Sequence, residues 1–130
     1  MMDQPSLAEI IRAVRTFLET KAIGELSGHT AFHARVAANA LAIAEREVTQ
    51  GPQADQNETA RLKALLHLEG NLETLNRALC ASIRAGAIAL DDPQLKEHLT
   101  ASTIAKVAID QPAYSGLQIA RSALTGASHP

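Results

Sequence analysis

The sequence predicts an all-α protein, folded as a single bundle of five to six helices with an alanine-rich second helix at its centre. Three observations support this fold class. Apolar residues recur every three to four positions along most of the chain, as on one face of a helix. The period-two alternation of strands is absent, and β-branched residues are scattered. Capping residues, glycines and prolines divide the chain into helix-sized segments. A length of 130 residues suits one domain.

The first helix is expected over residues 5–24. Pro5 is favoured in a first turn. Ser6 and Glu9 have the spacing of a capping box, although Asp3 is an equally suitable cap. Apolar residues then follow at helical spacing, namely Leu7, Ile10, Ile11, Val14, Phe17 and Leu18. The pattern predicts an amphipathic helix.

The second helix is expected over residues 29–48, ending where Gly51 and Pro52 interrupt the pattern. The string "QADQNE" that follows is expected to be a polar linker or a fraying helix start. At 100° per residue, one face of the helix gathers Phe32, Val36, Ala40, Ile43 and Ala44. The opposite side carries Ala38, Ala42, Glu45 and Arg46, and its alanines would let a neighbouring backbone come close. A helix that is small or apolar nearly all round tends to be central.

The remaining helices are expected over residues 58–69 and 72–85, from about Pro93 to the string "DQPAYSG", and over residues 117–124. Gly86 is suited to end the helix over 72–85. Asp91 or Asp92 caps the next helix, with Pro93 in its first turn. Pro112 disfavours helix at the residue before it, which ends that helix. Residues 117–130 are expected to be weakly ordered, and the final "TGASHP" disordered.

Composition argues against several function classes. A pI near 6.2 and an aromatic content of 2% disfavour nucleic-acid binding, which needs a basic stripe and often stacking rings. No apolar run approaches the length of a membrane span, so no membrane association is expected. The N-terminal "MMDQPSLAEI" does not resemble a secretion signal. The single cysteine, Cys80, excludes an internal disulfide framework and fits a reducing cytoplasm.

His29 and His33 are four residues apart, so one helix face would carry both. This is the ligand spacing of an "HExxH" metal helix, but Thr30 stands where that motif needs its glutamate. His67, His98 and His129 are isolated and offer no third ligand. The favoured interpretation is structural, with His29 at the helix start and His33 between helices. No metal site is predicted.

Arg35 and Asn39 are also four apart and share one edge of the second helix with Phe32. They could form a pocket for an anion or a carbonyl group, with Arg35 giving paired donors. The alternative, which we favour, is that they bond to a neighbouring loop or helix. Tyr114 is expected to anchor the C-terminal segment through its hydroxyl. If a binding site exists, its candidate residues are Phe32, His33, Arg35, Asn39 and Tyr114.

Other polar groups have structural explanations. Asp91 and Asp92 before Pro93 indicate helix capping rather than a catalytic pair. Cys80 in "ALCAS" is placed among core positions, where a thiol would be inert. A Gly-rich phosphate loop, a "GxSxG" elbow and a dinucleotide fingerprint are all absent. No catalytic residue and no cofactor is predicted.

Four strings together resemble one bacterial family. They are "P-LAEII-AVR-FLE" near the start, "AFHARVAAN-LAI-ERE" at 31–47, "L---LCASIRAGAIALDDPQL--HL" at 75–99 and "KVAIDQPAYSG" at 106–116. In this order they resemble the family named domain of unknown function 6285, over nearly the whole chain. The family's last string has an asparagine and a basic residue around the proline, where this chain has Gln111 and Ala113.

The resemblance implies a small helical protein with no established activity. It also implies an association with kinase-like small-molecule phosphotransferases and acyl-CoA dehydrogenases. We therefore expect a non-enzymatic accessory or interaction module for such an enzyme. The alternative is a small-molecule or acyl-CoA-linked binding protein or enzyme with a pocket around Phe32, His33, Arg35 and Asn39. A homodimer is a further expectation, since amphipathic faces with alanine-rich backs can self-pair.

Overall fold

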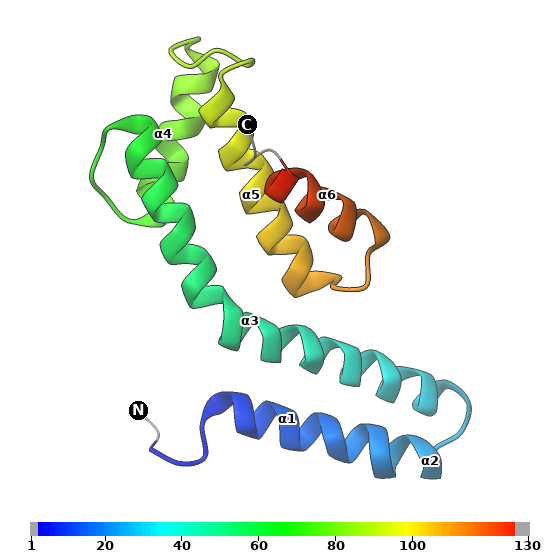
Figure 1. Cartoon of the computed structure of the whole chain (residues 1–130). Coiled ribbons are helices and arrows are strands. Elements are labelled where there is room, and N and C mark those ends of the chain that lie inside the picture. The colour runs from blue at the N-terminus through cyan, green and yellow to red at the C-terminus, as the bar shows by residue number, and fades with distance from the viewer. Residues whose placement is uncertain (1–2, 127–130) are drawn as a thin grey trace. The chain divides into compact units, whose positions relative to one another are not determined.

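The computed structural model describes residues 3–126, and within that range it contains helices and no strand, which confirms the all-α prediction. The first helix comprises α1 (Leu7–Phe17), the π-helical turn η1 (Leu18–Ala22) and α2 (Ile23–Glu25) without a gap. It is followed by α3 (Gly28–Leu66), α4 (Leu72–Arg84), α5 (Pro93–Asp110) and α6 (Ser115–Gly126) (Figure 1). Of the string expected to be disordered, Thr125 and Gly126 end α6 and residues 127–130 lie outside the described range. None of the helices within residues 3–126 is long and apolar enough to cross a membrane.

The chain divides into two compact units, Met1–Pro52 (unit 1) and Gln53–Pro130 (unit 2). Helix α3 contributes residues to both. The expectation that the whole chain forms a single domain stays a prediction.

The predicted helix end at Gly51 and Pro52 is wrong, because α3 continues through both residues to Leu66. The string "QADQNE" is therefore helical and not a linker. A proline inside a helix loses one backbone hydrogen bond and costs about 3 kcal/mol, but its fixed φ is itself helical. Gln53, Ala54 and Gln56 follow and have good helix propensity, which favours continuation of the helix.

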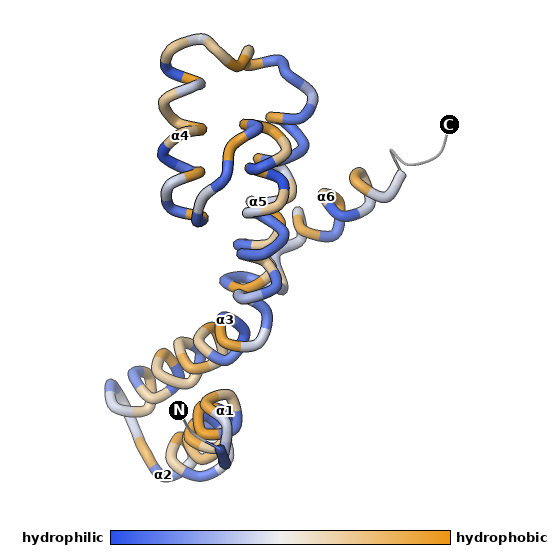
Figure 2. The backbone as a smooth tube through the Cα atoms, turned by 90° about the vertical axis from the view of Figure 1, so that its left-hand side faces the viewer, coloured by the Kyte–Doolittle hydropathy of each residue, from blue (hydrophilic) through white to orange (hydrophobic). Residues whose placement is uncertain are grey.

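Unit 1 is a pair of helices in which α1 lies antiparallel beside the first part of α3 (Figures 1 and 2). Ala31 and Ala38 are the buried apolar residues of this part of α3, at 6% and 3% exposure. The predicted core face is wrong at its largest members, since Phe32 is 57% and Val36 is 48% exposed. Alanines have no long side chain, so α1 can pack closely on the side of α3 that carries them.

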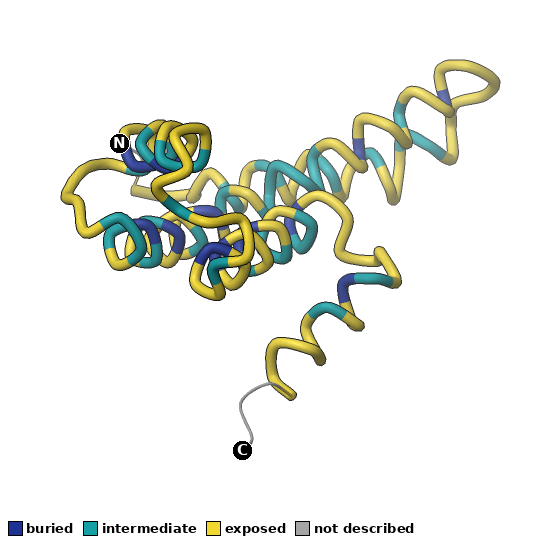
Figure 3. The backbone as a smooth tube through the Cα atoms, turned by 90° about the horizontal axis from the view of Figure 1, so that it is seen from above, coloured by how far each residue is buried: buried dark blue, intermediate teal, exposed yellow. Residues whose placement is uncertain are grey.

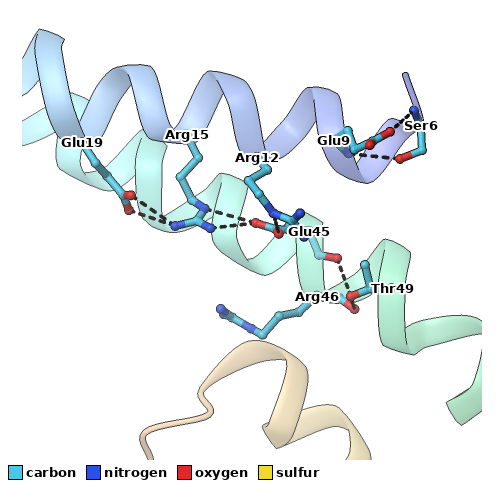
Figure 4. A network of polar contacts seen from close by, with 8 residues as sticks. All are labelled: Ser6, Glu9, Arg12, Arg15, Glu19, Glu45, Arg46 and Thr49. Atoms are coloured by element: carbon cyan, nitrogen blue, oxygen red, sulfur yellow. Dashed lines mark hydrogen bonds and ion pairs between the residues drawn. The ribbon is translucent and has the colours of Figure 1, made fainter. Parts of the chain in front are cut away.

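Ion pairs join the two helices of unit 1. Glu45 of α3 accepts hydrogen bonds from Arg12 Nε at 2.7 Å and from Arg15 Nη2 at 2.9 Å (Figure 4). Arg15 also pairs with Glu19 on its own helix, at 3.2 Å. Hydrogen bonds from Arg12 and then Arg15 lower the pKa of Glu45, because they stabilise its carboxylate form. At the start of α1, Ser6 and Glu9 form the predicted capping box.

The apolar side of α1 is largely exposed, although the helix is strongly amphipathic (Figure 2). No residue of α1 is buried, and exposed or partly buried backbone makes up most of the described chain in Figure 3. Four apolar residues at helical spacing are exposed to between 37% and 58%, namely Leu7, Ile10, Val14 and Phe17. We call these four residues the α1 stripe. Since α3 covers only part of the apolar side of α1, unit 1 leaves a hydrophobic surface open.

Unit 2 has a leucine core. Leu62 of α3, Leu75 and Leu79 of α4, and Leu95 of α5 are all exposed by 4% or less and pack together. Partly buried neighbours surround them, namely Leu65, Leu66, Leu72, Ile83 and Ile88. Three helical segments therefore meet at one hydrophobic centre. The last helix, α6, packs against α5.

The ends of the helices in unit 2 follow local chemistry. Asn71 caps α4 by accepting from the backbone N–H of Thr74. Gly86 has φ +71 and donates to the carbonyl of Ile83, which ends α4 as predicted. Asp92, and not Asp91, caps α5 by accepting from the N–H of Leu95, with Pro93 in the first turn. Gln111 is the C-cap of α5, as predicted from Pro112.

Candidate functional site

A group of polar side chains lies beside the leucine core of unit 2. Glu58 and His98 are 8% and 3% exposed, and Ser102 is 6% exposed. The Nδ2 atom of Asn76 donates to Glu58 Oε1 at 3.1 Å. The Nη2 atom of Arg61 donates to Ser102 Oγ at 3.1 Å. We call these five residues, from α3, α4 and α5, the polar cluster.

Helical spacing explains how these side chains come together. On α3, Glu58 stands four residues before Leu62 and three before Arg61, so Glu58 neighbours both on the helix surface. On α5, His98 and Ser102 follow Leu95 by three and seven residues. Polar residues therefore occupy positions on the same stripes as the core leucines. Burying such groups costs free energy unless they are hydrogen-bonded.

Two nitrogens of the cluster are shielded from solvent and lack a hydrogen-bond partner within residues 3–126. They are Arg61 Nε and His98 Nδ1. Burial lowers the pKa of His98 below its ordinary 6.5, and the charges of Arg61 and Lys106 lower it further, while Glu58 acts in the opposite sense. His98 is therefore held as a neutral imidazole near pH 7.

A half-open pocket of about 180 Å³ adjoins the cluster. Its walls include Arg61 and His98 together with Ala64, Leu65, Gln94 and Glu97. All of these residues belong to α3 and α5 within unit 2. The pocket thus combines one guanidinium, one imidazole and one carboxylate with an apolar wall.

Four of the five residues predicted as a binding site lie on the part of α3 that belongs to unit 1. Phe32, His33, Arg35 and Asn39 are all exposed. The rings of Phe32 and His33 meet edge to face, with centroids 5.5 Å apart. The sequence analysis expected His33 to be half-buried between helices, and this expectation is wrong because His33 is exposed. Whether these four residues bind a ligand stays a prediction.

The fifth predicted residue, Tyr114, lies in unit 2 at the turn between α5 and α6 and is 56% exposed. Its ring stands against Gly116, where an added Cβ would come within 2.5 Å of Tyr114 Cε1. With Ile104, Val107 and Leu117 it lines a small apolar pocket of about 80 Å³. Among residues 3–126 no hydrogen bond of the Tyr114 hydroxyl is found, so the anchoring that the sequence predicted through this hydroxyl is not observed.

The sequence analysis missed the polar cluster, since it treated His98 as isolated. The available signal was the position of His98 and Ser102 on the stripe of Leu95, where apolar residues are expected. The placement of Cys80 among core positions is also wrong, because Cys80 is exposed and its neighbour Leu79 takes the core position. Within residues 3–126 no three His, Cys, Asp or Glu side chains come together as metal ligands would, and His129 lies outside that range.

Fold and site together define a small all-α protein, with an open hydrophobic helix in one unit and a buried polar cluster in the other. The family model DUF6285, a domain of unknown function, matches residues 24–114. The chain belongs to this family, as its resemblance in sequence indicated. No curated protein and no solved structure matches the chain.

Proposed function

We propose that this protein is a non-enzymatic interaction module that binds a protein partner through the α1 stripe. The observation that carries the proposal is the exposure of Leu7, Ile10, Val14 and Phe17, at 50%, 37%, 47% and 58%. Contiguous exposed apolar surfaces of this kind commonly mark protein–protein contacts.

The spacing of the α1 stripe matches a known mode of recognition. Its residues follow one another by three, four and three positions, so they line one side of the helix. An amphipathic helix that presents anchors at such spacing binds by placing them in a hydrophobic groove. Arg12 and Arg15 on the same helix are already paired with Glu45. The contact would therefore rest on apolar burial more than on charge.

The resemblance discussed above suggests the class of partner. A kinase-like small-molecule phosphotransferase or an acyl-CoA dehydrogenase is the enzyme with which we expect this protein to associate. A second copy of the chain is the other occupant that the same surface would suit, because a two-fold dimer uses one patch twice. The proposal favours the enzyme as the partner, and the experiment described next distinguishes it from a second copy of the chain.

The test compares two charge insertions on α1. Val14→Glu places a charge in the α1 stripe, whereas Thr16→Glu places the same charge on an exposed residue about 200° further round the helix. Each variant is titrated calorimetrically against the phosphotransferase and the dehydrogenase encoded nearest to the gene. We expect binding by wild type and Thr16→Glu, and loss of binding by Val14→Glu.

Two results would overturn the proposal. One is equal binding by both variants, which would place the contact elsewhere. The other is no binding of either enzyme together with a monomeric mass by light scattering. A doubled mass in wild type that Val14→Glu alone reduces would replace the enzyme with a second copy as the occupant of the α1 stripe.

A second candidate function is supported by the exposed ring pair of Phe32 and His33. With Arg35 and Asn39 close by on α3, these residues offer an aromatic surface and a guanidinium to a small anionic ligand. A thermal-shift screen with acyl-CoA and phosphorylated metabolites tests this function. Stabilisation that Arg35→Ala removes without loss of helix content supports it, and equal stabilisation of Arg35→Ala refutes it.

A further inference from the structure

The pocket beside the polar cluster combines features of a ligand site that the interaction surface on α1 does not use. It has a volume of about 180 Å³. An engineered apolar cavity of roughly 150 Å³ is enough to hold benzene, and a water molecule occupies about 30 Å³ of liquid. The pocket therefore accommodates a small organic molecule and not only one or two waters.

Two side chains of the pocket wall contain buried nitrogens without a hydrogen-bond partner among residues 3–126. His98 is 3% exposed and its Nδ1 has no partner within residues 3–126. Arg61 uses Nη2 for Ser102, while its Nε is shielded and without a partner in the same range. A guanidinium has five N–H donors and no acceptor, and a neutral imidazole can donate from Nδ1. The matching ligand group therefore supplies acceptor oxygens.

The surrounding charges limit which anion fits. Glu97 lines the pocket, and the buried Glu58 acts on the same imidazole as Arg61. Two carboxylates nearby disfavour a dianion such as phosphate, because like charges repel strongly in a poorly solvated site. Arg61 and Lys106 both act on this imidazole as positive charges, and Arg61 lines the pocket, where the single carboxylate of a ligand can form paired hydrogen bonds with it.

The apolar wall completes the selection. Ala64 and Leu65 line the pocket on α3, where a hydrocarbon chain can lie against them. We propose that this pocket binds a small monocarboxylate with a short hydrocarbon tail. The carboxylate is held by Arg61 and His98, and the tail packs on Ala64 and Leu65. This site lies wholly within unit 2, so it goes beyond the proposed partner contact of α1 and does not depend on it.

The experiment uses the full chain and three probes of similar size. Sodium butyrate, butanamide and inorganic phosphate are titrated into labelled protein, followed by nuclear magnetic resonance of the histidine rings and by calorimetry. We expect saturable binding of butyrate with a shift of the His98 ring signal. Butanamide, which lacks the charge, should bind at least tenfold more weakly, since a hydrogen bond to a charged group contributes about 1.5–3 kcal/mol.

Matched variants assign the site. Arg61→Gln should weaken butyrate binding at least tenfold for the same reason. Arg77→Gln, in the same unit, removes an exposed arginine that pairs with Glu73 and should leave binding unchanged. Because Arg61→Gln disturbs a partly buried residue, Ala64→Leu provides a second test. It keeps Arg61 and fills the pocket from an exposed helix position, so it should also weaken butyrate binding.

Several outcomes would overturn the proposal. They are no saturable butyrate binding by wild type, phosphate binding as tight as that of butyrate, or butyrate binding that neither Arg61→Gln nor Ala64→Leu weakens. Circular dichroism of each variant confirms that it is folded. Partner binding through α1 is measured separately, so failure of one proposal leaves the other standing.

Discussion

The two units of this protein use different means to hold their helices together. Unit 2 buries Leu62, Leu75, Leu79 and Leu95 at one centre. Unit 1 buries only alanines among its apolar residues within the described range, and Glu45 joins its two helices through ion pairs. The difference teaches that apolar content alone does not make a core. Unit 1 is rich in apolar side chains, yet its largest ones remain open.

This contrast has a physical basis in the number of packed helices. Two helices can cover only one stripe on each other, and α1 has an apolar side wider than that stripe. Three helical segments surround the leucines of unit 2 and exclude water from all sides. We infer that unit 2 provides most of the stability of the protein and that unit 1 provides an open surface for binding.

The largest expected effect compares a core residue with a residue of the α1 stripe. Leu75→Ala removes a side chain that is 1% exposed and should destabilise the protein by about 2–5 kcal/mol. Phe17→Ala removes a larger side chain that is 58% exposed and should change stability by about 0.5 kcal/mol or less. Urea unfolding measures both. A similar cost for the two variants would show that the stripe is covered in solution.

A smaller effect is expected from overpacking the alanine contact in unit 1. Ala38 is 3% exposed, so Ala38→Leu should push α1 away from α3 and cost about 1–3 kcal/mol. Ala37→Leu places the same side chain on an exposed neighbour and should cost about 0.5 kcal/mol or less. Hydrogen exchange of the α1 amides reports the loosening. Equal exchange in the two variants would argue against close packing of α1 on the alanines.

The two units should also differ in how their stability depends on pH. In unit 2 the dependence should arise from His98. Burial and then the charge of Arg61 lower the pKa of His98, with Lys106 adding to and Glu58 opposing this effect. The unfolded chain therefore binds a proton more readily than the folded one. The free energy of unfolding should have its full value above pH 6.5, the ordinary pKa of histidine. It should decrease as the pH falls from 6.5 toward the lowered pKa of His98 in the folded protein. Urea midpoints at about pH 5.5 and 7.5 measure the change.

Two variants identify the source of that change. His98→Gln should flatten the dependence between those pH values, since it removes the titrating ring. His29→Gln removes an exposed histidine and should leave the dependence as in wild type. If wild type and His98→Gln depend on pH to the same extent, His98 is not buried as a neutral ring.

Unit 1 should respond in a more acidic range. The pKa of Glu45 is lowered, chiefly by the hydrogen bond from Arg12 and then by that from Arg15. This contribution to stability is present above the ordinary pKa of 4.5 and is lost as the pH falls through the lowered value. The protection factors of the α1 amides, which correct for the intrinsic pH dependence of exchange, should therefore fall in acid, and less so in Glu45→Gln. Glu25→Gln, which removes an exposed carboxylate of the same unit, is the control.

Local features of the fold could be predicted from the sequence, because their causes lie within a few residues. The Ser6–Glu9 capping box, the helix end at Gly86 and a cap at Asp91 or Asp92 each depend on one turn of chain, and the structure selects Asp92. The end of the second helix could not be predicted in this way. A proline signals a break, but whether the helix stops depends on what the following residues favour.

The pairing of residues within the polar cluster could not be predicted, because its members are distant in sequence. The Arg61–Ser102 bond joins residues 41 positions apart, and the Asn76–Glu58 bond joins residues 18 apart. The predicted core face of the second helix was wrong for another reason. Phe32 and Val36 are more hydrophobic than Ala31 and Ala38, yet the small residues are the buried ones, at seven-residue spacing from Glu45, which pairs with α1.

The smallest expected effect concerns the end of α3 in unit 2. His67 has φ 54, a left-handed conformation that suits glycine and strains a residue with a Cβ. His67→Gly should relieve this strain and stabilise the protein by at most about 1 kcal/mol, because the greater freedom of glycine in the unfolded chain offsets part of the gain. His67→Ala keeps the Cβ and should give no such gain. Thermal unfolding compares the two, and a glycine variant no more stable than the alanine variant would show that the turn is relaxed in solution. A gain confined to glycine would show that unit 2, despite its closed core, tolerates a strained helix end that its packing compensates.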